Sequence, residues 1–210
     1  MTERRFLPAA GRDIFLPLYD PAASLFGFQK VLTPLVAQAQ LQPGHVVLDV
    51  GCGTGTLAVF VKQRYPEVQI VGLDPDPKAL ARAQRKADRA GVSVVLERGF
   101  ADALPHGDGT FDRVFSSMMF HHLPRPDKLP TLLEIRRVLK PGGRLEFLDF
   151  AGGTSDGFLA HILHGHALNV AAENRLLQWM AEAGFAHAKR LNERGMPFGH
   201  VAFYQAEQPQ

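Results

Sequence analysis

Residues 46–55 read VVLDVGCGTG, and this stretch decides the fold of the chain. It begins as a short apolar run rich in valine, typical of a buried strand, and then breaks into glycines at alternate positions. Glycine has no Cβ to block a ligand, so the run predicts a tight loop that brings bare backbone to a ligand. Thr54 is the expected N-cap of a helix over residues 56–64, whose first N–H groups would point at that ligand.

The glycine spacing argues against a dinucleotide site. Proteins that bind NAD or FAD carry the pattern G-x-G-x-x-G, but here Gly55 falls one position early and Thr56 takes the expected place. The string VLDVGCGTG instead closely resembles motif I of class I methyltransferases that use S-adenosylmethionine. The string RRVLKPGGRLEFLDF, residues 136–150, is typical of the same family. The chain most resembles the branch that includes the ubiquinone and menaquinone C-methyltransferases (methyltransferase type 11).

Composition and charge fit a globular cytoplasmic protein. The chain has 210 residues, 46% of them hydrophobic and 21% charged, which suits one α/β domain with a full core. The formal net charge is only +2 and no basic run forms an arm, so we expect no nucleic-acid partner. Cys52 is the single cysteine, which excludes an internal disulfide or a cysteine metal cluster. Arg12 and Asp13 interrupt any signal-peptide core, and no apolar run approaches membrane-spanning length.

Predicted strands and helices alternate along the chain, as in an α/β protein with a parallel sheet. We expect strands near residues 46–50, 69–74, 92–97, 112–118, 144–150, 187–192 and 199–205, and helices near 21–41, 56–64, 77–90, 127–140, 158–170 and 173–183. The last two strands have no helix between them, which implies an antiparallel pair at the sheet edge. The resemblance implies a Rossmann-like, seven-stranded, mostly parallel sheet with an antiparallel last strand and helices on both faces.

We expect a single domain with three parts, because no repeat or low-complexity linker divides the chain. Residues 1–41 form an N-terminal helical lid or substrate segment, 42–150 the cofactor-binding core, and 151–210 a substrate helix and the C-terminal strands. The alternative for the N-terminal segment is that it is packed core, or docks on a membrane surface.

Two acids follow predicted strands and are candidates for ligand contacts. Asp74 ends a strand about 20 residues beyond the glycine loop, as expected for an acid that accepts hydrogen bonds from ribose hydroxyls. Its replacement by alanine should then weaken binding with little loss of stability. Asp76 precedes a proline and is expected to cap the next helix. The resemblance implies that Asp102 accepts from the adenine amine and that Ala101 offers its backbone. The alternative for Asp74 and Asp102 is a local turn role.

The resemblance assigns a cofactor site and leaves the catalytic groups as candidates. The predicted ligands of S-adenosylmethionine are Asp49, Gly51, Cys52, Gly53, Gly55, Asp74, Pro75, Ala101, Asp102, Ser116 and Ser117. Ser116 and Ser117 would close over the methionine part, mainly through their backbone. The catalytic candidates are His121, Tyr19 and His164: the histidines to accept a substrate proton, Tyr19 to direct its hydroxyl at the transferring methyl. No metal site is expected, because the histidines of residues 158–170 lack an evident third ligand.

The implied reaction is an in-line displacement, in which a substrate oxygen, nitrogen, carbon or sulfur attacks the donor methyl. The apolar N-terminal segment and the predicted helix 158–170 should enclose a small, partly apolar substrate. Three alternatives are open: an NAD-dependent oxidoreductase, a nucleic-acid amino-methyltransferase and a non-catalytic donor-binding protein. The second would carry an N/D-P-P-Y/F motif where residues 117–120 read SMMF. Whether the chain forms a homodimer is also open.

Overall fold

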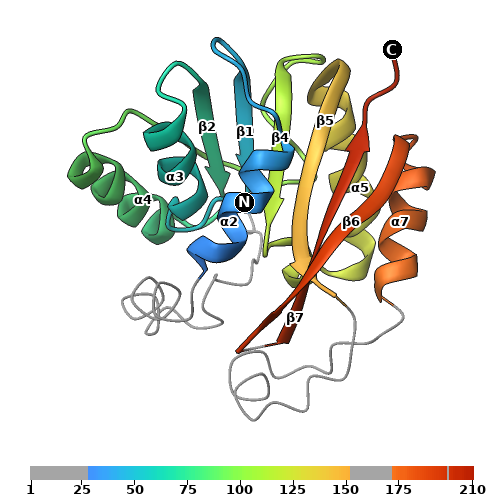
Figure 1. Ribbon diagram of the computed structural model, residues 1–210. Coiled ribbons are helices and arrows are strands. Elements are labelled where there is room, and N and C mark those ends of the chain that lie inside the picture. The colour runs from blue at the N-terminus through green and yellow to red at the C-terminus, as the bar shows by residue number, and fades with distance from the viewer. Residues whose placement is uncertain (1–27, 152–171, 198) are drawn as a thin grey trace.

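The computed structural model describes residues 28–151, 172–197 and 199–210 (Figure 1). The helices are α2 (Gln29–Gln38), α3 (Thr56–Arg64), α4 (Pro77–Ala90), the 3₁₀ turn η2 (Phe120–His122), α5 (Arg125–Val138) and α7 (Ala172–Glu182). The strands are β1 (Val46–Val50), β2 (Gln69–Asp74), β3 (Val95–Arg98), β4 (Phe111–Ser117), β5 (Leu139–Phe150), β6 (Ala186–Met196) and β7 (Gly199–Glu207). Tyr19, His164 and the predicted helix 158–170 lie outside the described residues.

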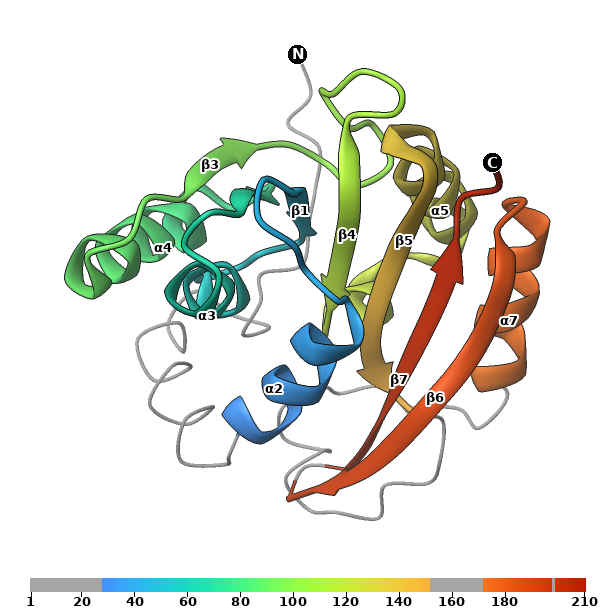
Figure 2. The same cartoon turned by 45° about the horizontal axis from the view of Figure 1, so that its top comes forward.

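The strands form one seven-stranded sheet in the order β3-β2-β1-β4-β5-β7-β6 (Figure 2). Strand β1 pairs in parallel with β2 on one side and β4 on the other, so Leu48 lies between Val71 and Val114. Strand β7 runs antiparallel to both of its neighbours, β5 and β6. The predicted mostly parallel sheet with an antiparallel last strand is confirmed.

Helices cover both faces of the sheet, and each face has its own apolar core (Figures 1 and 2). On one face, Leu35 of α2 and Phe60 of α3 belong to the same buried cluster as Phe115 of the sheet. On the other face, Ile135 of α5 and Met180 of α7 share a cluster with the sheet. Burial of each such side chain contributes roughly 1.5–3 kcal/mol, so these two layers hold the strand ends in place.

Several predicted boundaries are wrong, because contacts between distant parts of the chain override the local sequence signal there. Strand β3 starts at Val95, three residues later than expected, and β5 starts at Leu139 directly after α5. Thr54 is not the N-cap of α3: Gly55, in the left-handed region at φ 74°, occupies that position without a side-chain cap. The Thr54 hydroxyl instead accepts a hydrogen bond from Lys86 Nζ at 3.0 Å. The contact across to α4 therefore replaces the local cap that the sequence suggested.

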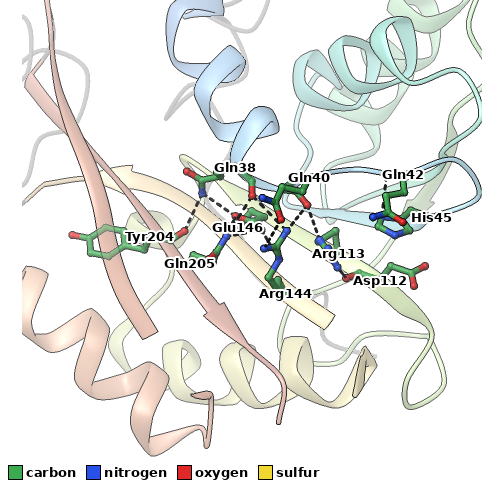
Figure 3. Close-up of polar contacts among 11 residues, drawn as sticks. Gln38, Gln40, Gln42, His45, Asp112, Arg113, Arg144, Glu146, Tyr204 and Gln205 are labelled. Atoms are coloured by element: carbon green, nitrogen blue, oxygen red, sulfur yellow. Dashed lines mark hydrogen bonds and ion pairs between the residues drawn. The ribbon is translucent and has the colours of Figure 1, made fainter. Parts of the chain in front are cut away.

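Two arginines fasten the C-terminal end of α2 to the sheet (Figure 3). Arg113 Nε and Arg144 Nη2 both donate to the Ala39 carbonyl, at 2.8 and 2.7 Å. Beside them, the fully buried Glu146 accepts from Gln38 at 2.9 Å and from Gln205 at 3.2 Å. Cations at the carbonyl end of a helix are favourable, because that end carries partial negative charge. This cluster fixes α2, whose N-cap residue Phe28 reaches the pocket described below.

Candidate functional site

A pocket opens where the parallel strands β1, β2, β3 and β4 end. This edge is where open α/β sheets bind ligands, because the strand ends leave a crevice between the loops. The residues that line it are Phe28, Asp49, Gly51, Cys52, Gly53, Thr54, Thr56, Leu57, Leu73, Asp74, Pro75, Phe100, Ala101, Asp102, Ser117, Met118, Met119, His122, Leu123, Pro124 and Asp127.

The glycine loop forms one wall, and its glycines have different roles. Gly51, Gly53 and Gly55 all have positive φ angles, of 69°, 52° and 74°. A Cβ on Gly51 would lie 2.1 Å from Met119 Cγ, so glycine is needed for the loop to pack against that pocket residue. A Cβ on Gly55 would lie 2.7 Å from Ala83 Cβ, so Gly55 allows α3 to approach α4. Gly55 does not line the pocket.

Asp74 holds the glycine loop against the end of β2. Its Oδ2 accepts the backbone N–H of Gly53 at 2.9 Å, and its Oδ1 accepts the N–H of Asp76 at 2.9 Å. Burial raises the pKa of this carboxyl, while the two N–H donors act in the opposite direction. Each carboxylate oxygen can accept a further bond, so Asp74 can brace the loop and also receive a ligand hydroxyl. These contacts do not support the expectation that replacing Asp74 by alanine costs little stability.

Asp49 is the most deeply buried acid of the pocket. It is 1% exposed, and among the described residues its Oδ2 has no hydrogen-bond partner. Burial, and secondly the charge of Asp74, raise the pKa of Asp49 to about 7. A buried carboxyl group is costly to ionise without a partner, and a nearby cation stabilises its ionised form. Asp49 is therefore suited to receive a positively charged group.

The segment after β4 forms another part of the lining, next to the glycine loop. Met118 has a φ of 55°, in the left-handed region, and Met118, Met119, His122 and Leu123 line the pocket. Asp149 of β5 clamps this segment: it accepts the backbone N–H of His121 at 3.0 Å and lies 2.6 Å from His121 Nδ1. Burial raises the pKa of Asp149, but the charge and hydrogen bond of His121 outweigh it and hold the pKa below its usual value.

Most of the predicted cofactor residues meet in this pocket. Those that line it are Asp49, Gly51, Cys52, Gly53, Asp74, Pro75, Ala101, Asp102 and Ser117. Ser116 points the other way along the pleat and is fully buried, because successive strand residues face opposite sides of the sheet. His121 also does not line the pocket, whereas its neighbour His122 does.

Sequence reasoning expected Phe28 to help enclose the substrate, but it missed the rest of the apolar lining, which is Phe100, Met118 and Met119. Phe28, Phe100 and the adjacent pair Met118 and Met119 reach the pocket from three separate places in the chain. Their positions directly before a helix or after strand ends were the available signal, but which of them face inward depends on how the loops pack. Among the described residues, no group of three or more His, Cys, Asp or Glu side chains could hold a metal ion. No helix in the described ranges is both long and apolar enough to cross a membrane.

Residues 47–143 match the methyltransferase domain family. This range includes the glycine loop, the strands β1 and β2 that carry Asp49 and Asp74, and the start of β5. This region resembles a methyltransferase domain. The demethylmenaquinone methyltransferase of Deinococcus radiodurans is 41% identical over 114 residues, which are 54% of this chain and 46% of that protein. The 27-O-demethylrifamycin SV methyltransferase of Amycolatopsis mediterranei is 36% identical over 118 residues, 55% of this chain and 42% of that protein.

The chain also resembles solved structures in its fold. A Haemonchus contortus phosphoethanolamine N-methyltransferase, solved in complex with S-adenosyl-L-methionine, matches with a TM-score of 0.71 and 17% sequence identity. The match covers 86% of this chain and 53% of that chain. This chain spans about half the length of the curated relatives it matches, for example 46% of the Deinococcus protein.

Proposed function

We propose that this chain transfers a methyl group from S-adenosylmethionine to a small, partly apolar acceptor. The observation that carries the proposal is the pocket at the strand ends, where a glycine loop faces the carboxyl groups of Asp49, Asp74 and Asp102. Its lining combines these polar groups with the aromatic ring of Phe100 and the side chain of Met119, which suits a ligand that is part nucleoside and part amino acid.

The residues of the pocket fit this donor. Asp74 keeps lone pairs for ribose hydroxyls after binding Gly53 and Asp76, and Asp102 and Ala101 are assigned to the adenine end. Asp49 offers a buried carboxyl oxygen to a positive group of the ligand. When bound, S-adenosylmethionine supplies an electrophilic methyl group on a positively charged sulfur. The chain's own contribution is to orient the reactants and exclude water around them.

An acceptor that carries a proton needs a group to receive it. His122 lines the pocket and is the described imidazole that we assign to this step. His121 is assigned a positioning role, because its Nδ1 lies 2.6 Å from the buried Asp149. The roles of Tyr19 and His164 stay predictions from the sequence.

A matched pair of variants separates the two histidines. His122→Ala should lower turnover of a phenolic acceptor at pH 7 while leaving the affinity for S-adenosylhomocysteine within about twofold. His121→Ala should weaken that affinity, because the segment that lines the pocket then keeps only the backbone bond of residue 121 to Asp149. If His122→Ala retains full turnover on every proton-bearing acceptor, the proton-accepting role is wrong.

The acceptor is best found by a screen for formation of S-adenosylhomocysteine. The purified full chain is incubated with S-adenosylmethionine and with phenols, quinols, amines and thiols in turn. The two curated relatives described above are named for different acceptors, demethylmenaquinone and 27-O-demethylrifamycin SV, so they do not select one. Turnover of a small acceptor supports the proposal. Donor binding without turnover of any class would favour a non-catalytic binding protein, and preference for NADH would favour an oxidoreductase.

The remaining expectations rest on the sequence alone. They are a single domain, a substrate enclosed by residues 1–41 and the segment 158–170, a cytoplasmic location, the absence of a nucleic-acid partner and the open question of a homodimer. A truncation that lacks residues 1–20 tests the enclosure: full turnover of the best acceptor by the truncated chain would argue against a lid.

A further inference from the structure

Asp49 differs from the other acids of the pocket in how its charge is compensated. Asp74, which also lines the pocket, receives two backbone N–H donors, from Gly53 and Asp76. Asp49 is 1% exposed and its Oδ2 has no hydrogen-bond partner within the described part of the chain. A buried carboxylate oxygen without a donor is unfavourable, so burial and the nearby charge of Asp74 favour the neutral acid of Asp49 in the free protein below pH 7.

Among the described residues, the charge that acts most on Asp49 is the negative charge of Asp74. Asp74 faces it from β2, and Cys52 of the glycine loop, whose thiol pKa is raised by burial, is affected by the charges of both acids. From β4 and the segment after it, Ser117 and His122 line the same pocket, as do Asp102 and Asp127. Lys86 of α4 donates to the hydroxyls of Thr54 and Thr56, at 3.0 and 2.6 Å, on the loop side.

We propose that Asp49 makes the pocket selective for cationic ligands: it is a neutral acid in the free protein and gives up its proton when a positively charged ligand binds. The O–H bond of the carboxyl group breaks, the carboxylate stays in the pocket beside the cation, and the proton passes to the buffer. This inference rests on the proposed function, because S-adenosylmethionine is the cation that the pocket is proposed to hold. It adds that binding and ionisation are one coupled event.

The coupling fixes how affinity depends on pH. Below the pKa of about 7 the free protein must lose a proton to bind a cation, so affinity should rise with pH up to about 7 and then level off. The limiting slope is about tenfold in Kd per pH unit, as for any single linked proton. Adenosine shares the adenine and ribose but has no cationic centre, so its binding should release no proton and show no such slope.

Calorimetry of the full chain measures the released proton directly. S-adenosylmethionine is titrated at one pH into protein in buffers that differ in their enthalpy of ionisation. The slope of the observed binding enthalpy against the buffer ionisation enthalpy gives the number of protons released per ligand bound. We expect about half a proton per ligand at pH 7 and nearly one at pH 6, as follows from a pKa of about 7. Adenosine is the neutral probe and should give a slope of zero.

Two variants make the test specific. Asp49→Asn keeps the size of the side chain but has no proton to release, so its slope should vanish and its affinity for S-adenosylmethionine should no longer rise with pH. Asp102→Asn is the matched control: it removes another pocket carboxylate, and proton release should persist. A thermal unfolding curve checks that each variant is folded, and the wild-type slope is informative even if a variant is not.

The outcomes separate this inference from the proposed function. Binding of S-adenosylmethionine without proton release, or equal release by adenosine, overturns the inference and leaves the donor site standing. Retention of the slope in Asp49→Asn assigns the proton to another group and also overturns it. Failure of S-adenosylmethionine to bind at any pH removes the proposed function itself, and this inference with it.

Discussion

The carboxylate of Asp74 accepts the backbone N–H of Gly53 at 2.9 Å, across 21 positions of sequence. The same carboxylate accepts the N–H of Asp76, so one side chain joins the glycine loop to the end of β2 and the start of α4. A residue predicted as a ligand contact is thus also a support of the loop that carries the other contacts.

Asp74→Ala is therefore expected to lower stability as well as ligand affinity. The variant leaves two N–H groups without this acceptor, and the free energy of unfolding should fall by about 1–3 kcal/mol. Urea unfolding measures the loss, and Asp88→Ala is the control, because Asp88 is exposed and should change stability by less than about 0.5 kcal/mol. Equal stability of the two variants would mean that the loop holds its shape without Asp74.

Asp49 should make the free protein less stable as pH rises. Its pKa is raised in the folded state from 3.8 to about 7, so between these values the folded state binds a proton that the unfolded state does not. The contribution of Asp49 to the free energy of unfolding is therefore fully present below pH 4 and is lost as pH rises through 7. Asp49→Asn has no charge to bury and should be more stable than the wild type at pH 8, by up to about 4 kcal/mol.

The difference between the two unfolding curves is the measured quantity for Asp49. Other groups add a pH dependence of their own to both chains: the pKa of Asp149 is lowered, whereas burial raises the pKa of Glu146. Urea unfolding of both chains at pH 5 and pH 8 isolates Asp49. A difference that does not grow with pH would show that Asp49 is ionised at low cost.

Gly51→Ala should disturb the pocket through Met119. The new Cβ would lie 2.1 Å from Met119 Cγ, and the backbone φ of 69° disfavours any residue with a Cβ. We expect a loss of about 2–4 kcal/mol in the free energy of unfolding, the sum of backbone strain and overpacking. The double variant Gly51→Ala/Met119→Ala removes the clash but not the strain. It should be more stable than the sum of the single effects predicts, and strict additivity would contradict the contact.

The two arginines on the Ala39 carbonyl should be partly redundant. Arg113→Met or Arg144→Met alone leaves that carbonyl with one donor, whereas the double variant leaves it with neither. The double variant should lose about 1–2 kcal/mol more than the sum of the single losses, because an unsatisfied carbonyl appears only then. A double-mutant cycle by urea unfolding measures this additional loss in the free energy of unfolding. A value near zero would mean that water replaces both guanidinium groups.

The sequence determined the local elements that carry the fold. The predicted bounds of β1, β2, α3 and α4 agree with the structure, and Asp76 caps α4 by accepting the N–H of Lys78 at 2.8 Å. Alternating apolar residues, glycine turns and caps act over a few neighbouring positions, so the sequence contains them in full. The string VLDVGCGTG similarly indicated the resemblance to methyltransferases, because the glycines and the acid before them lie within one short stretch.

Only the tertiary structure decided which side chains line the pocket and which groups lie next to their charges. His122 rather than His121 lines it, because Asp149, 28 residues away, binds His121. Gly55 faces Ala83 and Ser116 faces the interior, so neither lines the pocket although both stand in the motifs. Asp49 and Asp74 look alike in sequence, each an acid on a buried strand. Packing gives Asp74 two N–H donors and leaves one oxygen of Asp49 without a described partner, because hydrogen bonds and desolvation depend on neighbours brought together by folding.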